Sequence, residues 1–179
     1  MTGRAEQRLE ELRRAFDETF ATPTASCGEE LRGALAIRAG SGRFAVRIED
    51  LAAVEAYRRA TPLPGIAPGL LGLAGVRGQL VAAYDLGALL GCRPADAGGP
   101  EARLRWLLLC ASSPEVGLAI EEIEGYVRFS SADLHAGDGA ERGQHVREAL
   151  RHGGALLGLI DVPRTLGALA RHAAGAPGP

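Results

Sequence analysis

Residues of the types that most often carry chemistry are few in this chain of 179 residues, and they are scattered. His145 and His152 are the closest pair of histidines, but they lie seven residues apart, unlike the i, i+4 pair of a zinc-binding helix. His135 falls in a polar stretch and His172 near the C-terminus, and no cysteine is near any of the four. We therefore expect solvated histidines and no metal site.

The cysteines and serines do not assemble a recognisable catalytic pattern either. Cys27, Cys92 and Cys110 are odd in number, widely spaced and without a C-x-x-C pair, which argues against a disulfide framework and fits a reducing cytosol. Ser112 or Ser130 could enter a Ser-His-Asp arrangement, but no G-x-S-x-G elbow accompanies them. The sequence therefore predicts a protein that is not an enzyme and uses no cofactor.

A glycine-rich stretch contains Gly72, Gly75 and Gly78, and such a loop could cradle a phosphate. It lacks the Gly-Lys-Ser/Thr ending of a P-loop and leads into a strand pattern, so a tight turn and close strand packing explain it better. Arg77 is the only charge between Gly69 and Asp85. Two interpretations of Arg77 stay open, an ordinary solvated turn residue and a partner-binding residue.

The bulk properties are those of a soluble globular protein. Hydrophobic residues make up 46% and charged residues 23%, and the formal net charge of −2 argues against nucleic-acid binding. The N-terminus lacks the apolar region of a signal peptide, and no run approaches the ~18 apolar residues of a membrane span. We expect a cytoplasmic protein without membrane insertion.

Strand patterns dominate the chain. Two short apolar runs flank the turn Val76–Gln79 and predict a β-hairpin, and further apolar or alternating runs lie at 31–57, 104–110, 116–127 and 155–160. The 25 glycines fit an all-β protein with many turns. Residues 146–152 could form a helical turn or two, and 164–169 a short helix.

Two stretches repeat one pattern, in which an apolar strand ends at an aspartate and a helix follows. They are Tyr84-Asp85-Leu86 and Ile160-Asp161-Val162. A carboxylate at the start of a helix accepts hydrogen bonds from free N–H groups, so we expect Asp85 and Asp161 to be structural caps. The repeat suggests two related small barrels in one chain.

Residues 1–22 have the period of an amphipathic helix, with apolar residues at steps of three and four up to Phe16 and Phe20. This stripe could pack on the chain's own β-domain or dock with a partner. Residues 23–30 have the composition of a linker, and 173–179 that of a disordered tail.

The central stretch resembles the CheW-like domain, the adaptor module of bacterial chemosensory arrays. The resemblance rests on the proline-rich segment from Thr61 to Gly65, the turn Gly75-Val76-Arg77-Gly78 and the exit Tyr84-Asp85-Leu86, and it extends to Phe44-Ala45-Val46 and the strand from Gly117. Two departures stand out. Gly75 replaces the asparagine of the family's turn, and Ala53 occupies its glutamate position, although Glu55 lies two residues on.

The resemblance implies a mostly-β fold of two intertwined SH3-like five-stranded barrels around a shared core, spanning 31–172. The barrels would lie at roughly 31–91 and 104–162 and be closed by the C-terminal helix. It also implies a scaffold that joins methyl-accepting chemotaxis receptors to the regulatory domain of a CheA-type histidine kinase, and that contacts other CheW-like proteins. Its receptor groove would include Arg77, Gly72, Gly78 and Val76, with Ile48, Leu51, Ala53 and Val54 as kinase contacts.

The departures favour a divergent accessory adaptor, in a pathway such as surface motility, that keeps only part of these contacts. Two other classes stay open. One is a structural interaction module that oligomerises or docks through the N-terminal helix. The other is a regulator that binds a small molecule or a metal.

Overall fold

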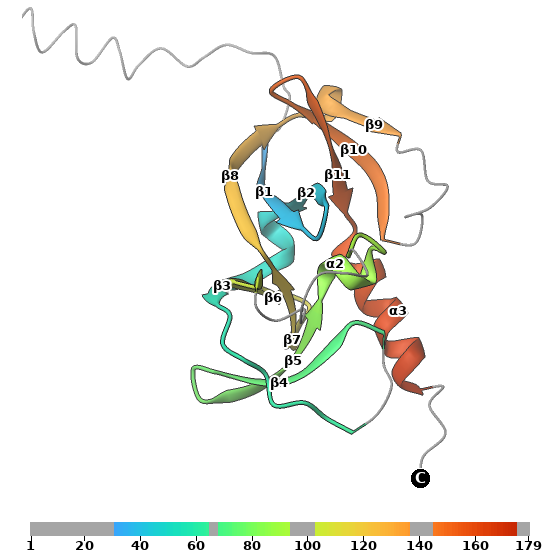
Figure 1. Cartoon of the computed structure of the whole chain (residues 1–179). Coiled ribbons are helices and arrows are strands. Elements are labelled where there is room, and N and C mark those ends of the chain that lie inside the picture. The colour runs from blue at the N-terminus through green and yellow to red at the C-terminus, as the bar shows by residue number, and fades with distance from the viewer. Residues whose placement is uncertain (1–30, 65–67, 94–102, 137–144, 175–179) are drawn as a thin grey trace, which may run out of the picture. The chain divides into compact units, whose positions relative to one another are not determined.

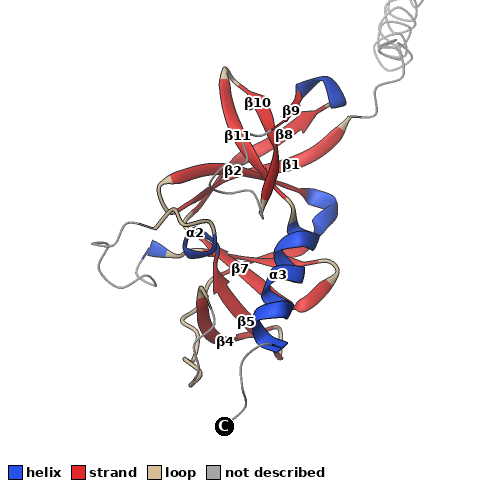
Figure 2. Cartoon of the chain, turned by 90° about the vertical axis from the view of Figure 1, so that its right-hand side faces the viewer, coloured by secondary structure: helices blue, strands red, loops and turns tan. Residues whose placement is uncertain are grey.

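The computed structural model describes residues 31–64, 68–93, 103–136 and 145–174, which are mostly β-strand (Figure 1). The predicted helix at 1–22 and linker at 23–30 lie outside the described residues, so both stay predictions. The strands form two sheets that curl into two barrels, one above the other in Figure 2. Among the described residues, no helix has both the length and the hydropathy required to cross a bilayer.

Six strands form the first sheet, in the order β8-β1-β2-β11-β10-β9. Their bounds are β1 Arg32–Ala39, β2 Gly42–Arg47, β8 Glu122–Phe129, β9 Leu134–Ala136, β10 Val146–His152 and β11 Ala155–Ile160. The two edge strands, β8 and β9, follow each other in the chain and are joined by the short 3-10 helix η3, Ser131–Asp133. Because this segment runs from one edge of the sheet to the other, it closes the sheet into a barrel, here called barrel A.

Five strands form the second sheet, in the order β3-β6-β7-β5-β4. Their bounds are β3 Leu51–Ala56, β4 Leu70–Val76, β5 Gln79–Asp85, β6 Trp106–Cys110 and β7 Ser113–Ile120. The edges meet because Thr61, which follows β3, pairs with Leu73 of β4 through two backbone hydrogen bonds of 2.8 Å. This closes the second sheet into barrel B.

The barrels are nested in sequence. Barrel B uses strands between residues 51 and 120, whereas barrel A combines β1 and β2 with β8 to β11. The predicted division at 31–91 and 104–162 is therefore not the division between the sheets. The reason is the parallel pair of β2 and β11, where Phe44 lies opposite Gly158, since a parallel partner can come from anywhere beyond a long crossover.

The internal repeat is present in the structure. β5 pairs in parallel with β7 in barrel B, as β11 pairs in parallel with β2 in barrel A. Each of these strands leads into a helix, α2 (Leu86–Leu89) after β5 and α3 (Val162–Ala174) after β11. The sequence prediction of two related barrels with this common exit is confirmed.

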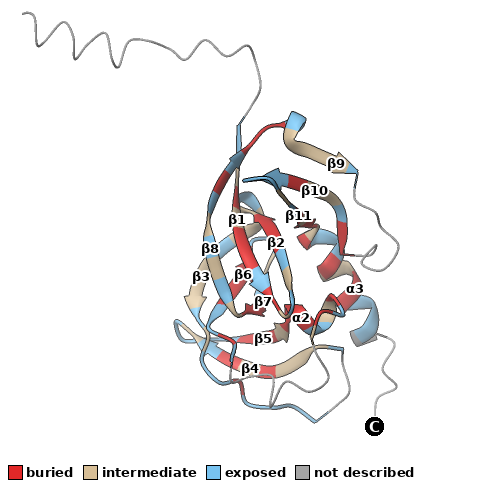
Figure 3. Cartoon of the chain, turned by 45° about the horizontal axis from the view of Figure 1, so that its top comes forward, coloured by how far each residue is buried: buried red, intermediate tan, exposed pale blue. Residues whose placement is uncertain are grey.

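The core has three parts, one inside each barrel and one between them. Side chains alternate along β2, so that Phe44 and Val46 join the shared cluster while Ala45 lies inside barrel A. On β6, Leu108 joins the shared cluster while Leu107 lies inside barrel B. Both faces of these central strands are therefore buried, which explains their continuous apolar runs (Figure 3).

Two local expectations were wrong. Residues Val146–His152 form β10 rather than a helical turn, because they pair with both β9 and β11. The final helix runs from Val162 to Ala174, longer than the predicted 164–169 and into the predicted tail. Pro163 lies in its first turn, where the missing N–H costs no hydrogen bond.

Candidate partner-binding surface

The tip of the β4–β5 hairpin holds Arg77 in an unusual conformation. Arg77 and Gly78 have φ values of 48° and 81°, the pattern of a type I′ turn, whose first central position suits asparagine or glycine. Within the described ranges, Arg77 is the only residue other than glycine with positive φ. A left-handed arginine costs about 1–2 kcal/mol, which makes it a candidate for a functional role.

The Arg77 side chain has a partner in the fold. It is 73% exposed, and its Nη2 lies 2.5 Å from Oε1 of Glu55 on β3, which is 24% exposed. The pair connects the hairpin to the opposite edge strand of barrel B. The sequence comparison placed the family's glutamate position on Ala53, which instead packs partly against the core of barrel B, so Glu55 is the carboxylate that faces Arg77.

Gly72 does not offer a surface to a partner. Its φ is 134°, and a Cβ atom added there would lie 2.0 Å from the carbonyl oxygen of Thr61. The space beside Gly72 is thus filled by the strand that closes barrel B. Gly78 is different, because no atom lies within 4 Å of its added Cβ, and Val76 packs partly against the barrel B core.

The four predicted kinase contacts lie on one stretch, the 3-10 helix η1 (Ile48–Asp50) and β3. Ile48 is 41% exposed. Leu51 and Val54 pack partly against the shared core, and Ala53 against barrel B. Among these four, only Ile48 presents a largely exposed side chain.

Two exposed leucines were missed in the sequence. Leu80 and Leu156 each lie five residues before the aspartate that ends the strand, so they hold equivalent positions in the two barrels. They are 69% and 62% exposed. A single exposed leucine needs no explanation, and here the same position of the repeat is exposed in both barrels. Aligning the repeat at Asp85 and Asp161 would have found them.

The two aspartates occupy the capping positions that the sequence predicts. Asp85 Oδ1 accepts a hydrogen bond from the Ala88 N–H at 3.2 Å, and Asp161 Oδ1 accepts one from the Arg164 N–H at 3.0 Å. Ser130 also has a structural role, since its side chain and that of Asp133 form a capping box at η3.

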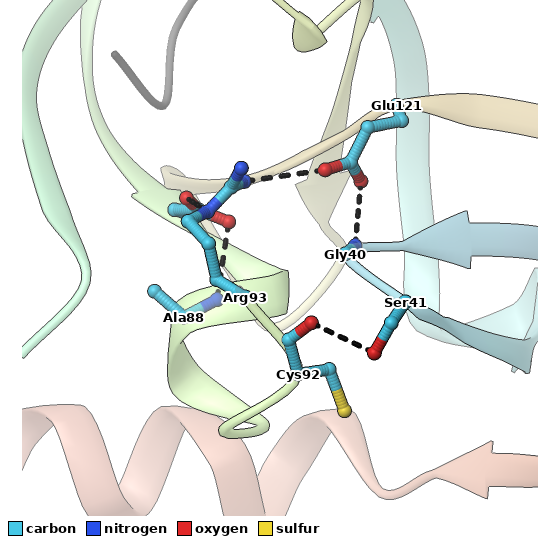
Figure 4. Close-up of polar contacts among 7 residues, drawn as sticks. Gly40, Ser41, Ala88, Cys92, Arg93 and Glu121 are labelled. Atoms are coloured by element: carbon cyan, nitrogen blue, oxygen red, sulfur yellow. Dashed lines mark hydrogen bonds and ion pairs between the residues drawn. The ribbon is translucent and has the colours of Figure 1, made fainter. Parts of the chain in front are cut away.

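The second oxygen of Asp85 belongs to a buried polar network around Arg93 (Figure 4). The Arg93 guanidinium forms ion pairs with Asp85 and with Glu121, the latter at 3.3 Å. Glu121 Oε2 accepts the Gly40 N–H at 2.9 Å. Burial alone would lower the pKa of Arg93, but the hydrogen bond and charge of Asp85, then of Glu121, raise it. The network joins the loop after α2 to the β1–β2 turn and so ties the two barrels together.

His145 is buried, contrary to the expectation of solvated histidines. Its Nδ1 lies 3.1 Å from Oγ1 of Thr165, and that hydroxyl donates to the Asp161 carbonyl at 2.9 Å. Because the hydroxyl proton is used, Nδ1 carries the proton and donates to Thr165. Burial, and next the charges of Arg164 and His172, lower the pKa of His145. Within the described ranges no cluster of His, Cys, Asp and Glu could hold a metal ion.

Comparisons with known proteins give one family. Residues 33–170 match the family model of the CheW-like domain. The chain is 28% identical over 107 residues to the chemotaxis protein CheW of Rhizobium meliloti (strain 1021), covering 60% of this chain and 65% of the relative. It is 30% identical over 92 residues to a probable chemotaxis protein CheW of Rhizobium etli, covering 51% and 57%. The alignments thus span less than two thirds of either relative.

The fold has a solved counterpart. The scaffolding protein TtCheW from Thermoanaerobacter tengcongensis superposes with a TM-score of 0.63 at 12% identity, covering 74% of this chain and 90% of that one. At this identity the likeness establishes the architecture of two barrels.

Proposed function

The chain belongs to the family of CheW-like domains, and on this premise we propose that it is a non-enzymatic cytoplasmic scaffold of a bacterial chemosensory pathway. Its partners would be methyl-accepting receptors and the regulatory domain of a CheA-type histidine kinase. Other CheW-like proteins would be further partners.

The observation that carries the proposal is the conformation of Arg77. The fold holds an arginine, mostly exposed, at a turn position where asparagine or glycine would cost less. Glu55 orients its guanidinium, whose planar fork suits backbone carbonyls or carboxylates of a receptor segment. Residues in such strained conformations cluster at active sites, ligand clamps and switch regions, which supports a role in partner binding.

The two equivalent leucines support a second contact. Leu80 and Leu156 project from corresponding hairpins of the two barrels. A kinase regulatory domain or another CheW-like protein with a similar barrel could cover either leucine with apolar surface. Two such ends on one molecule would allow it to bridge neighbours, as a scaffold must.

The test is pairwise binding of the purified chain to the receptor signalling tip and to the kinase regulatory domain of its own genome. Arg77→Gly removes the side chain while keeping, or relaxing, the turn, and we expect it to lose receptor binding without loss of stability. Leu80→Ser and Leu156→Ser should weaken kinase or self-association. Arg128→Gly on β8 is the matched control for an exposed arginine.

Each outcome is informative. Binding to both partners establishes a full coupling scaffold, and binding to one marks the accessory adaptor that the sequence departures favour, as in a surface-motility pathway. Binding to neither refutes the proposal. Full receptor affinity in Arg77→Gly would refute the role given to that side chain.

A further inference from the structure

A cleft of about 860 Å³ opens where the two barrels meet at the start of β6. Among the described residues, its charged lining consists of Arg38, Arg93, Arg103, Arg105, Glu121 and Glu122. Four arginines thus face two glutamates, in a chain whose formal net charge is −2. The cleft is a locally positive region of an otherwise slightly acidic protein.

The charged side chains in the inner part of the cleft are paired with other residues of the fold. Arg93, only 14% exposed, is held by Asp85 and Glu121. Arg38 forms an ion pair with Glu122, and both side chains are 49% exposed. These groups have their charges balanced internally and do not call for a ligand.

The outer rim differs. Arg103 and Arg105 are exposed, and neither guanidinium forms an ion pair or hydrogen bond with another residue in the described part of the chain. The backbone of Arg105 is fixed by hydrogen bonds to Ile120 and from Tyr57, at 3.0 and 2.8 Å. Trp106 follows directly and is 38% exposed in the same cleft. Two guanidinium groups without an acidic partner among the described residues therefore lie beside an accessible aromatic ring.

We propose that this cleft binds an acidic segment of a partner protein. Aspartate or glutamate side chains of that segment pair with Arg103 and Arg105, because the guanidinium fork matches a carboxylate in two parallel hydrogen bonds. An apolar side chain of the same segment packs on Trp106, the kind of aromatic anchor that concentrates binding energy. The excess positive charge selects for acidic partners and speeds their approach.

This site goes beyond the proposed function, since it defines the chemistry of a bound segment whatever protein carries it. It also stands apart from the side chains of Arg77, Leu80 and Leu156, none of which lines the cleft. Binding at the cleft and coupling of receptor to kinase can therefore succeed or fail separately.

The experiment uses the intrinsic fluorescence of Trp106, the only tryptophan of the chain. The full chain is titrated with a synthetic hexaglutamate peptide that carries one central leucine. We expect a saturable change that weakens as salt screens the charges, between about 50 and 200 mM NaCl. Replacing both rim arginines, Arg103→Gln with Arg105→Gln, should weaken binding by about tenfold or more, since two charge-assisted contacts are lost.

The controls decide the interpretation. Arg128→Gln with Arg151→Gln removes the same charge from exposed positions outside the cleft and should change affinity by less than about twofold, as screened distant charges do. Equal loss in both double variants would reduce the effect to general charge attraction and overturn the proposal. So would equal binding of the matching hexalysine peptide, or tighter binding of an oligothymidylate, which would indicate a nucleic-acid site. Absence of any saturable change at low salt would also overturn it.

Discussion

Closure of barrel B makes Gly72 the most sensitive glycine of the β4–β5 hairpin. Substitution by alanine places Cβ 2.0 Å from the Thr61 carbonyl oxygen, and the backbone φ of 134° is one that residues with side chains rarely adopt. The backbone around Thr61 must move away, which breaks the two hydrogen bonds between Thr61 and Leu73. We expect a large loss of stability without any change at the exposed tip of the hairpin.

The magnitude follows from these two costs. Each broken hydrogen bond is worth about 0.5–1.5 kcal/mol, and the backbone strain of alanine about 1–3 kcal/mol. The free energy of unfolding should therefore fall by about 4 kcal/mol, which lowers the Tm of a chain of this size by roughly 8–16 °C. Urea and thermal unfolding followed by circular dichroism measure both quantities.

The same hairpin supplies two matched controls. Gly78→Ala meets no atom within 4 Å but keeps a φ of 81°, so only strain of about 1–2 kcal/mol applies. Gly75→Ala meets neither obstacle and should stay within about 0.5 kcal/mol of the native chain. If Gly72→Ala unfolds with the same midpoint as Gly78→Ala, then closure through Thr61 contributes nothing measurable and the reasoning fails. Loss of receptor binding in Gly72→Ala would not by itself identify a contact residue.

Three further predictions concern buried groups. The pKa of Cys110 is raised to about 12, first by burial and then by the charges of Asp50 and Glu115, and Cys92 is also buried. In a Cys27→Ser variant, we therefore expect neither thiol to react with a thiol reagent at pH 7 faster than the protein unfolds. The pKa of His145 is lowered from its ordinary 6.5, so below that pH the unfolded chain binds more protons than the folded chain. The contribution of His145 to the free energy of unfolding is therefore present above about pH 6.5 and is lost as the pH falls through the folded pKa. Urea titrations from pH 5 to 8 should show this slope, and His145→Asn, which retains a donor but does not titrate, should remove it; an unchanged slope would assign it to other groups. Arg93→Met leaves Asp85 buried without its cation and should lower the free energy of unfolding by about 3–5 kcal/mol. Arg38→Met, in a half-exposed ion pair, should lower it by at most about 1 kcal/mol. Similar urea midpoints for the two variants would contradict the stabilising role given to the polar network around Arg93.

Local features of the fold were predictable because their causes lie within a few residues. The β4–β5 hairpin follows from two apolar runs around Arg77-Gly78, and the caps follow from an aspartate at each strand end. The pattern at 146–152 misled because Val146 and Leu150, four residues apart, suggest a helical face. In the structure they are buried by pairing on both sides of β10, which no local spacing reveals.

The candidate site was predicted only in part, for a related reason. Arg77 was recognisable as a lone charge, but its partner Glu55 depends on how the edges of barrel B come together. A register shift between Leu51 and Ala53 also means that counting residues along β3 does not show which residue faces Arg77. Gly72 was assigned to the receptor groove, whereas the chain's own Thr61 occupies the space beside it. The equivalence of Leu80 and Leu156 follows from aligning the repeat at Asp85 and Asp161, whereas their exposure depends on how the barrels pack.

The nesting of barrel B within barrel A has a consequence for synthesis on the ribosome. All strands of barrel B are complete by residue 120, whereas β2 has to wait for its parallel partner β11 until Ile160 has emerged. At a typical 5–20 residues per second, the more than one hundred residues between them take about 5–25 s to translate. During that interval the nascent chain exposes an unpaired strand edge beside Phe44. Chaperone dependence and premature association should therefore concentrate on the β1–β2 hairpin, whose strands are made before those of barrel B but are fully paired only after them.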